Sequence, residues 1–147
     1  ILFCKNKHNI LNYNDKKIQF VDIVYTTQKD RSEEEVLSEL LEKHQDLAGI
    51  ICTDLQTTEM VIDYAKKQSE ITYKIVGFDT SEKIVGEIGK LLVGTVSQEP
   101  YDIGYAAVVA AARSISDMGN AARVNTNHIW IDVENLASKE VQGVLYE

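Results

Sequence analysis

Residues 75–98 read IVGFDTSEKIVGEIGKLLVGTVSQ, and this stretch decides the fold that we predict. Two apolar runs, 73–77 and 92–97, flank a segment with the Glu, Lys, Ile and Val pattern of a short helix, 81–91. Asp79 follows the first run and Gln98 follows the second. Two strands joined by a helix, each strand ending on a polar side chain, are typical of an open parallel sheet with a ligand site at its carboxyl edge.

The same alternation extends along the chain in both directions. We expect further strands at 1–4, 18–25, 47–53 and 128–133, and further helices at 31–44, 56–68, 101–118 and 134–147. This order predicts an α/β fold, with an open, mainly parallel sheet and helices on both faces. The segment 5–17 is short and polar for a crossover helix. Either the first two strands pair antiparallel, or that helix is missing.

Composition and charge exclude several classes of partner. The 147 residues have a net charge of −8 and a pI of about 4.9, which disfavours direct contact with nucleic acid or with anionic membrane surfaces. No run approaches the ~20 apolar residues of a membrane span. Cys4 and Cys52 lie in apolar runs and are expected to be buried structural thiols. The chain opens on a strand pattern without an initiator Met, so we expect it to begin inside a larger protein.

Three polar residues end successive strands of the predicted sheet. Asp54, Asp79 and Gln98 should converge on one edge, and Thr27 and Gln28, after the second strand, could join them as ligand-binding residues. Two carboxylates and an amide suit a neutral polyol or an amine better than a phosphate. The alternative is that these residues are helix N-caps or loop surface, and it is strongest for Asp54.

Motifs for other chemistry are absent from the sequence. There is no Gly-x-Gly-x-x-Gly, no nucleophile elbow and no paired spacing among His8, His44 and His128. We therefore expect no catalytic residue, no metal and no cofactor, and a protein that is not an enzyme.

Two motifs resemble a known family. Gly77-Phe78-Asp79 and the later run Gly94-Thr95-Val96-Ser97-Gln98-Glu99-Pro100-Tyr101-Asp102-Ile103-Gly104-Tyr105 resemble type I periplasmic binding proteins of the ribose-binding-like group. The ligand domain of that group is shared with LacI-type regulators. The stretch from Leu40 to Asp54, with its His44-Gln45-Asp46-Leu47 turn, is similar to the helix and strand that precede the motif in the family.

The resemblance implies a two-lobe arrangement of which this chain is the C-terminal lobe. Residues 1–98 would form the ligand-binding lobe, and 99–147 the crossover helix, the returning strand and a terminal helix of the same domain. Asp79 matches the sugar-binding Asp of the family and Gln98 its binding Gln at the hinge. Asp54 matches a position that is usually Asn. The N-terminal lobe would be a missing partner, so the Ala/Val helix should expose an apolar face unless it docks on its own sheet or on a second copy in a homodimer.

Three functions follow as hypotheses. The first is the ligand-capture domain of a solute-binding protein that serves an ABC permease, takes a sugar or a similar small polar molecule, and is extracytoplasmic, either periplasmic or membrane-anchored. The second is the effector-binding domain of a LacI-type transcription regulator, which would be cytoplasmic, or of a membrane sensor. The third is a phosphorelay receiver with Asp54 as phosphate acceptor, which the sequence disfavours because Lys5-Asn6 and Gln98-Glu99 stand where it needs an acidic pair and a Lys.

Overall fold

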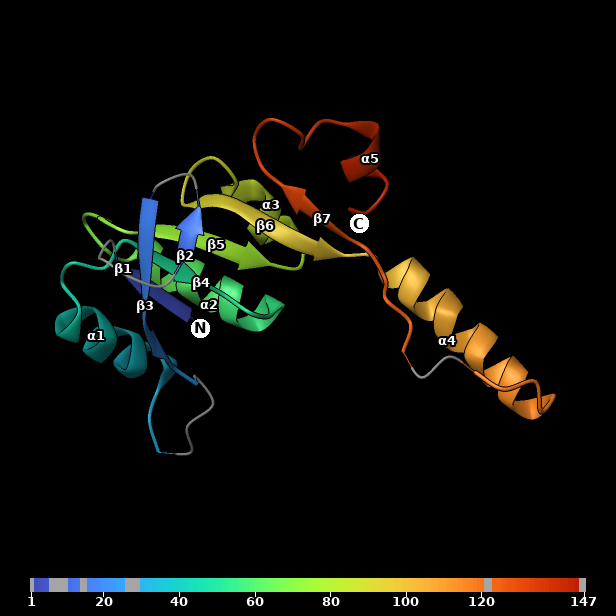
Figure 1. Ribbon diagram of the computed structural model, residues 1–147. Coiled ribbons are helices and arrows are strands. Elements are labelled where there is room, and N and C mark those ends of the chain that lie inside the picture. The colour runs from blue at the N-terminus through green and yellow to red at the C-terminus, as the bar shows by residue number, and fades with distance from the viewer. Residues whose placement is uncertain (1, 6–10, 14–15, 26–29, 121–122, 146–147) are drawn as a thin grey trace.

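The computed structural model describes residues 2–5, 11–13, 16–25, 30–120 and 123–145 (Figure 1). Within these residues seven strands form one mixed sheet in the order β2-β3-β1-β4-β5-β6-β7. The strands are β1 (Leu2–Lys5), β2 (Leu11–Tyr13), β3 (Lys16–Ile23), β4 (Gly49–Ile51), β5 (Lys74–Phe78), β6 (Leu92–Gln98) and β7 (His128–Ile131). The helices are α1 (Glu33–Lys43), α2 (Leu55–Lys66), α3 (Glu82–Glu87), α4 (Pro100–Ile115) and α5 (Lys139–Gln142).

Parallel pairing is confined to the centre of the sheet. β5 pairs parallel with β4 and with β6, whereas β7 pairs antiparallel with β6. β1 pairs antiparallel with both β3 and β4, and β2 forms an antiparallel hairpin with β3. The α/β class is confirmed, and of the two alternatives for the start of the chain the antiparallel one is correct. An antiparallel neighbour needs no crossover helix, which explains the short polar segment after β1.

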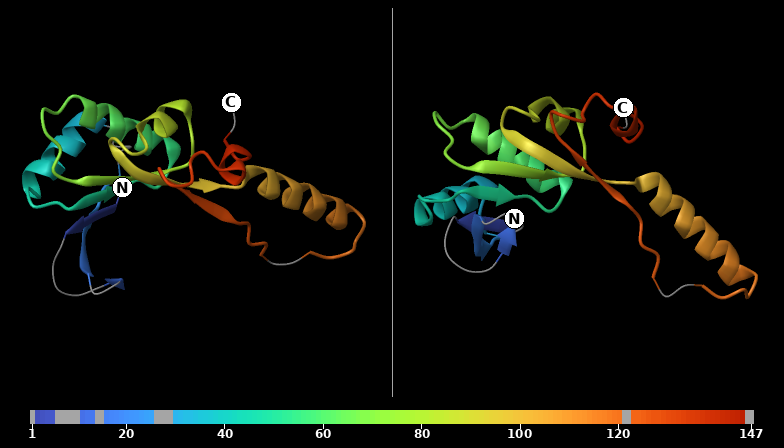
Figure 2. Two further views of the ribbon diagram at one scale, coloured as in Figure 1. Left: turned by 90° about the horizontal axis from the view of Figure 1, so that it is seen from above. Right: turned by 45° about the horizontal axis from the view of Figure 1, so that its top comes forward.

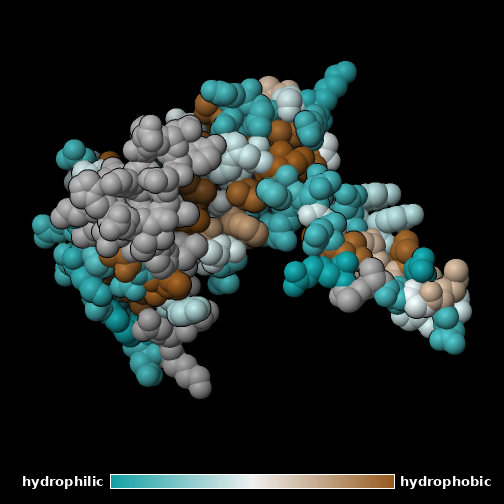
Figure 3. All heavy atoms as spheres, in the orientation of Figure 1, coloured by the Kyte–Doolittle hydropathy of each residue, from teal (hydrophilic) through white to brown (hydrophobic). Residues whose placement is uncertain are grey.

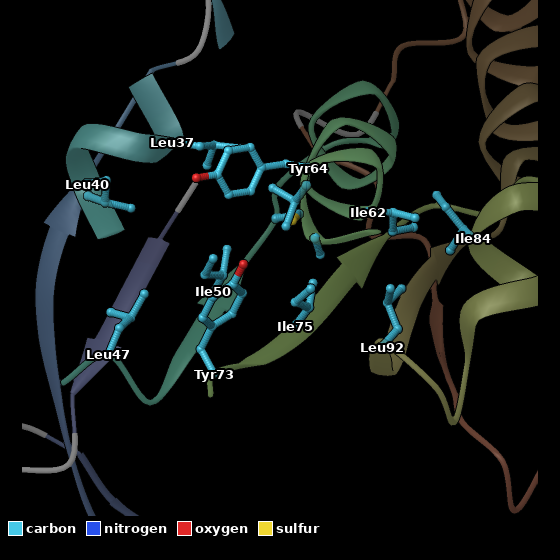
Figure 4. Close-up of a cluster of buried hydrophobic side chains, with 13 residues drawn as sticks. Leu37, Leu40, Leu47, Ile50, Ile62, Tyr64, Tyr73, Ile75, Ile84 and Leu92 are labelled. Carbon is cyan, nitrogen blue, oxygen red and sulfur yellow. The ribbon is translucent and has the colours of Figure 1, made fainter. Parts of the chain in front are cut away.

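The helices α1, α2 and α3 all pack on one face of the sheet, where the sequence had predicted helices on both faces. Ile50, Ile75 and Leu92 are register partners on three neighbouring strands, so their side chains point the same way. These three side chains share one buried cluster with residues of all three helices, among them Leu37, Leu40, Val61, Ile62, Tyr64 and Ile84 (Figure 4). The described residues between β1 and β3 form the short strand β2 and not a helix that could cover the other face.

Each helix of this layer starts at a side chain that caps it. Ser32 and Glu35 form a capping box at the start of α1. Asp54 caps α2 and Ser81 caps α3 by accepting backbone N–H groups of the first turn. The helices α2 and α3 begin within four residues of the ends of β4 and β5, so these caps place their N-termini at the carboxyl edge of the sheet.

The helix α4 projects away from the sheet (Figures 1 and 2). None of its residues is buried. We call α4 and the described residues that return from it to β7, 116–120 and 123–127, the arm. Its exposed apolar side chains are Tyr101, Ile103, Tyr105, Val108, Val109, Ile115, Met118 and Val124. Of the two ways in which its apolar face could be covered by this protein, docking on the chain's own sheet is not observed among the described residues, and docking on a second copy stays a prediction. Among the described helices, none combines the length and hydropathy needed to cross a bilayer.

The predicted terminal helix over 134–147 is wrong for most of its length. Only α5, from Lys139 to Gln142, is helical in the described part of this segment. Asp132 accepts the backbone N–H of Glu134 at 2.9 Å, and Asn135 accepts that of Asp132 at 3.0 Å and donates to the Trp130 carbonyl at 2.6 Å. Such local side-chain bonds satisfy the backbone in turns and compete with a helix. Ile131 and Val141 are buried together with Ile88, which holds α5 against the sheet.

The substitution Gly94→Ala should destabilise the protein strongly. A Cβ at Gly94 would lie 2.5 Å from the backbone oxygen of Ile131 and would overlap the Trp130 ring, so β6 and β7 would have to separate. We expect a loss of about 2 kcal/mol or more in the free energy of unfolding, measured by urea denaturation. The matched control is Gly86→Ala in α3, where a Cβ meets nothing within 4 Å. It should be neutral or stabilise by up to about 1 kcal/mol. Equal unfolding midpoints for the two variants would contradict this packing.

The fluorescence of Trp130, the sole tryptophan, should change only at strongly acidic pH. Its indole N–H donates to Asp132 Oδ2 at 2.8 Å, and this bond, with backbone bonds from Glu134 and Asn135, holds the pKa of Asp132 below its ordinary value of 3.8. The ionised carboxylate therefore contributes stability above that ordinary value, and the contribution is lost as pH falls through the lowered pKa. A fluorescence titration should show a midpoint below 3.8. The variant Asp132→Asn should lack this transition, and a variant that kept it would refute the assignment.

Candidate functional site

The polar pair Asp79–Gln98 lies at the carboxyl edge of the parallel strands. Asp79 follows β5 and Gln98 is the last residue of β6, and Gln98 Nε2 lies 3.0 Å from Asp79 Oδ1. The structure thus brings together the two residues on which the sequence prediction rested. Asp54 follows β4 on the same edge. Thr27 and Gln28, also predicted to bind ligand, lie outside the described residues, so their placement stays a prediction.

Both backbone polar groups of Asp79, the N–H and the carbonyl, form hydrogen bonds with β6. Its N–H donates to the Val96 carbonyl at 2.8 Å, and its own carbonyl accepts from Thr95 Oγ1 at 2.8 Å. Asp79 has a φ of 63°, a left-handed conformation that Asp adopts more readily than most residues. Thr95 is fully buried, so its hydroxyl is a rigid support. The Asp79 side chain therefore leaves the sheet in one defined direction.

The hydrogen bond within the pair determines what it offers a ligand. An ionised carboxylate only accepts, so the Gln98 amide must present its nitrogen to Asp79 and its oxygen away from it. The second Asp79 oxygen and the Gln98 amide oxygen are both acceptors. The pair is therefore suited to a ligand that donates hydrogen bonds, such as a compound with neighbouring hydroxyl groups, and is unsuited to an anion.

Asp54 has a local structural role at the same edge. Its Oδ1 accepts the Thr57 backbone N–H at 2.8 Å, and its Oδ2 accepts the Thr57 hydroxyl at 2.8 Å. The N-cap alternative raised from the sequence describes this geometry. The side chain remains exposed, and each carboxylate oxygen can accept a further bond. A role in ligand binding stays a prediction for Asp54.

Two buried threonines support the edge. Thr95 lies within the motif quoted above, although no role was predicted for it, and sequence reasoning did not single out Thr58. Thr95 bonds the Asp79 carbonyl, and the Thr58 hydroxyl lies 2.8 Å from the Asp54 carbonyl oxygen and 3.0 Å from the Phe78 nitrogen. The exposed fraction of both side chains is 0%. The signal in the sequence was a threonine on the inward face of α2, beside Val61 and Ile62, where a fully apolar residue is expected.

An acidic pair lies next to Gln98, at the start of the arm. The pKa of Glu99 is raised by a hydrogen bond with Asp102, and further by desolvation and by the nearby charges of Asp102 and Glu140. His128 opposes the shift. This pair does not build a metal centre: among the described residues, no group of three His, Cys, Asp or Glu side chains is arranged to hold a metal.

Comparison with known proteins identifies the fold. No protein-family model matches the chain, and no curated protein has significant sequence similarity to it. Solved structures do match. An ABC transporter solute-binding protein from Agrobacterium vitis bound with alpha-D-tagatopyranose is 23% identical over 78% of this chain and 39% of its own, with a TM-score of 0.69. A second from the same organism, with bound D-fucose, is 21% identical over 77% and 40%, with a TM-score of 0.67.

A third structure is somewhat closer in sequence. The glucose-galactose binding protein from Geobacillus stearothermophilus is 27% identical over 71% of this chain and 38% of its own, with a TM-score of 0.63. The chain thus spans about two fifths of the length of the proteins it matches. Its fold is that of one lobe of the type I periplasmic sugar-binding proteins, as the sequence resemblance predicted.

The capping role of Asp54 can be tested by substitution. Asp54→Ala removes the cap of α2 and should lower the free energy of unfolding by about 1 kcal/mol in urea denaturation. Asp54→Ser keeps a capping oxygen and removes the carboxylate, so its stability should stay close to that of the wild type. Equal destabilisation by both variants would mean that the carboxylate charge, rather than the cap, is what stabilises α2.

Proposed function

We propose that this chain is the C-terminal lobe of a solute-binding protein that captures a sugar or a similar small polyol for an ABC importer, without performing chemistry on it. The single observation behind the proposal is the Asp79–Gln98 pair, fixed at the carboxyl edge of β5 and β6 in this fold. The pair offers acceptors to a ligand rich in hydroxyl groups. The matching structures named above include proteins solved with D-fucose and with alpha-D-tagatopyranose, which have the same kind of ligand chemistry.

A second lobe is part of this proposal. The chain spans about two fifths of the matching proteins, and the arm presents a row of apolar side chains that its own sheet does not cover. Figure 3 shows tan and brown apolar residues along the arm, apart from the rest of the molecule. We infer that the arm packs on the amino-terminal lobe and that the second lobe brings the remaining ligand contacts to face Asp79 and Gln98.

The location and the further partner follow from the same proposal. A solute-binding protein of an importer works outside the cytoplasmic membrane and delivers its ligand to the permease. Two of the matching structures are ABC transporter solute-binding proteins, which supports this assignment. The strongly negative charge of the chain fits a partner other than nucleic acid or an anionic membrane surface.

The chain alone should bind monosaccharides only weakly. Micromolar affinity requires about 8 kcal/mol, whereas each hydrogen bond to a charged group contributes roughly 1.5–3 kcal/mol before the cost of association. Asp79, Gln98 and Asp54 together fall short of about 8 kcal/mol once the cost of association is subtracted. Calorimetry with D-fucose, D-tagatose, D-glucose and D-galactose should detect no micromolar binding to this chain. Micromolar binding by the chain alone would refute the need for a second lobe.

Ligand binding by the two-lobe protein should depend on the Asp79 carboxylate. A thermal-shift screen of the same monosaccharides should find a stabilising ligand, and Asp79→Asn should weaken its affinity about 10- to 100-fold because a charged acceptor is lost. Asn tolerates a positive φ, so the backbone can be retained. Asp117→Asn is the matched control, since Asp117 also has a positive φ, 52°, but lies on the arm. Unchanged affinity in Asp79→Asn would remove Asp79 from the site.

A further inference from the structure

The strand β5 extends beyond its neighbour β4 at the carboxyl edge. β4 ends at Ile51, whose register partner is Val76, whereas β5 continues to Phe78. The Val76 carbonyl accepts the Cys52 N–H at 2.9 Å, so the backbone polar groups of Val76 point toward β4. In a strand this direction repeats every second residue. The backbone N–H and carbonyl of Phe78 therefore point the same way as those of Val76, past the end of β4. Backbone groups in such a position require another partner.

The hydroxyl of Thr58 takes the place of that strand. Thr58 Oγ1 accepts the Phe78 N–H at 3.0 Å and donates to the Asp54 carbonyl at 2.8 Å, and the Phe78 carbonyl lies 3.2 Å away. A bond to the carbonyl four residues back is common for a helical threonine. The bond from Phe78 is different, because it joins residues that are 20 positions apart. It ties the first turn of α2 to the residue immediately before Asp79.

The side chain of Thr58 lies in a tightly packed place away from solvent. Its side chain is fully buried, and its methyl group would lie 3.0 Å from a Cβ added at Gly77. Burial raises the pKa of the nearby Cys52 thiol to about 12, so it stays a neutral group. Loss of the hydroxyl alone would leave the Phe78 N–H without its partner in a tightly packed place.

We propose that Thr58 is a positioning residue for the ligand site: its hydroxyl holds the end of β5, and through it the Asp79 side chain, in the geometry that meets Gln98. That Asp79 belongs to a ligand site rests on the proposed function. Thr95 fixes the Asp79 carbonyl from the β6 side, and Thr58 fixes the preceding residue from the α2 side. The loop that presents the carboxylate is therefore held between two buried hydroxyl groups.

Nuclear magnetic resonance of the 15N-labelled chain tests this inference without any sugar. The variants are Thr58→Val, which keeps the shape and removes the hydroxyl, and Thr58→Ser, which keeps the hydroxyl. Ser38→Ala is the matched control, because it removes another hydroxyl bond to α2, the 3.0 Å contact between Ser38 and Tyr64, far from the edge. The readouts are hydrogen exchange of the Phe78 amide relative to the Ile75 amide, and the chemical shifts of the Gln98 side-chain amide protons.

In Thr58→Val the Phe78 amide should exchange about tenfold faster relative to Ile75, the size of effect expected for one lost buried bond. The variant Asp79→Ala, which removes the carboxylate partner of Gln98, serves as the reference for an unpaired amide. In Thr58→Val the chemical shifts of the Gln98 amide protons should move toward those measured in Asp79→Ala. Thr58→Ser and Ser38→Ala should keep the wild-type ratio and shifts. Equal acceleration of Phe78 and Ile75, or unmoved Gln98 protons, would overturn the positioning role and leave only a contribution to stability. A two-lobe protein that bound no monosaccharide would refute the proposed function alone, since these readouts involve no ligand.

Discussion

The close approach of three elements at Gly77 is the constraint on which the candidate site depends. A Cβ at this position would lie 2.9 Å from Leu92 Cδ2, 2.9 Å from Thr95 Oγ1 and 3.0 Å from Thr58 Cγ2. Because Gly77 has no side chain, α2 and β6 both come close to β5 near its end. That proximity is what lets one hydroxyl from each side reach the backbone around Asp79. A larger residue at Gly77 would push both hydroxyl groups outward and release the loop.

A sheet edge that binds ligand has two opposing requirements, and this arrangement satisfies both. The backbone groups at the end of a strand must find hydrogen-bond partners, yet a further strand placed there would close the edge to ligand. Side-chain hydroxyl groups satisfy the same backbone atoms in much less space. Thr58 and Thr95 therefore support Asp79 from behind, while its carboxylate and the Gln98 amide stay at the open edge.

Much of the fold could be predicted from local patterns. The alternation of strand and helix predicted the central strands and their helices, and the rule for parallel strands brought Asp79 and Gln98 together. The hairpin of β2 and β3, the single helical layer and the turns after Asp132 were missed. Strand order depends on partners distant in sequence, and a turn built by polar side chains has no hydrophobic period.

The buried threonines show a different limit of sequence reasoning. Thr58 shares the inward face of α2 with the apolar residues Val61 and Ile62, and nothing in its local sequence indicates that it bonds Phe78, 20 residues away. Asp54 shows the converse: a residue type typical of both caps and binding sites was placed correctly on the edge, but its geometry there is that of a cap. A pattern predicts where a side chain lies more readily than which atoms it contacts.

The arm separates apolar surface from charge within the chain. α4 contains one acidic residue, Asp102, and one basic residue, Arg113, so its own net charge is near zero, whereas the whole chain has a net charge of −8. Attraction between two exposed arms acts at contact, but repulsion between two molecules acts over a Debye length, about 10 Å at 0.1 M salt. Self-association of the chain is therefore governed by ionic strength. Charge repulsion keeps the molecules apart in dilute buffer, and added salt screens this repulsion so that two arms can come into contact.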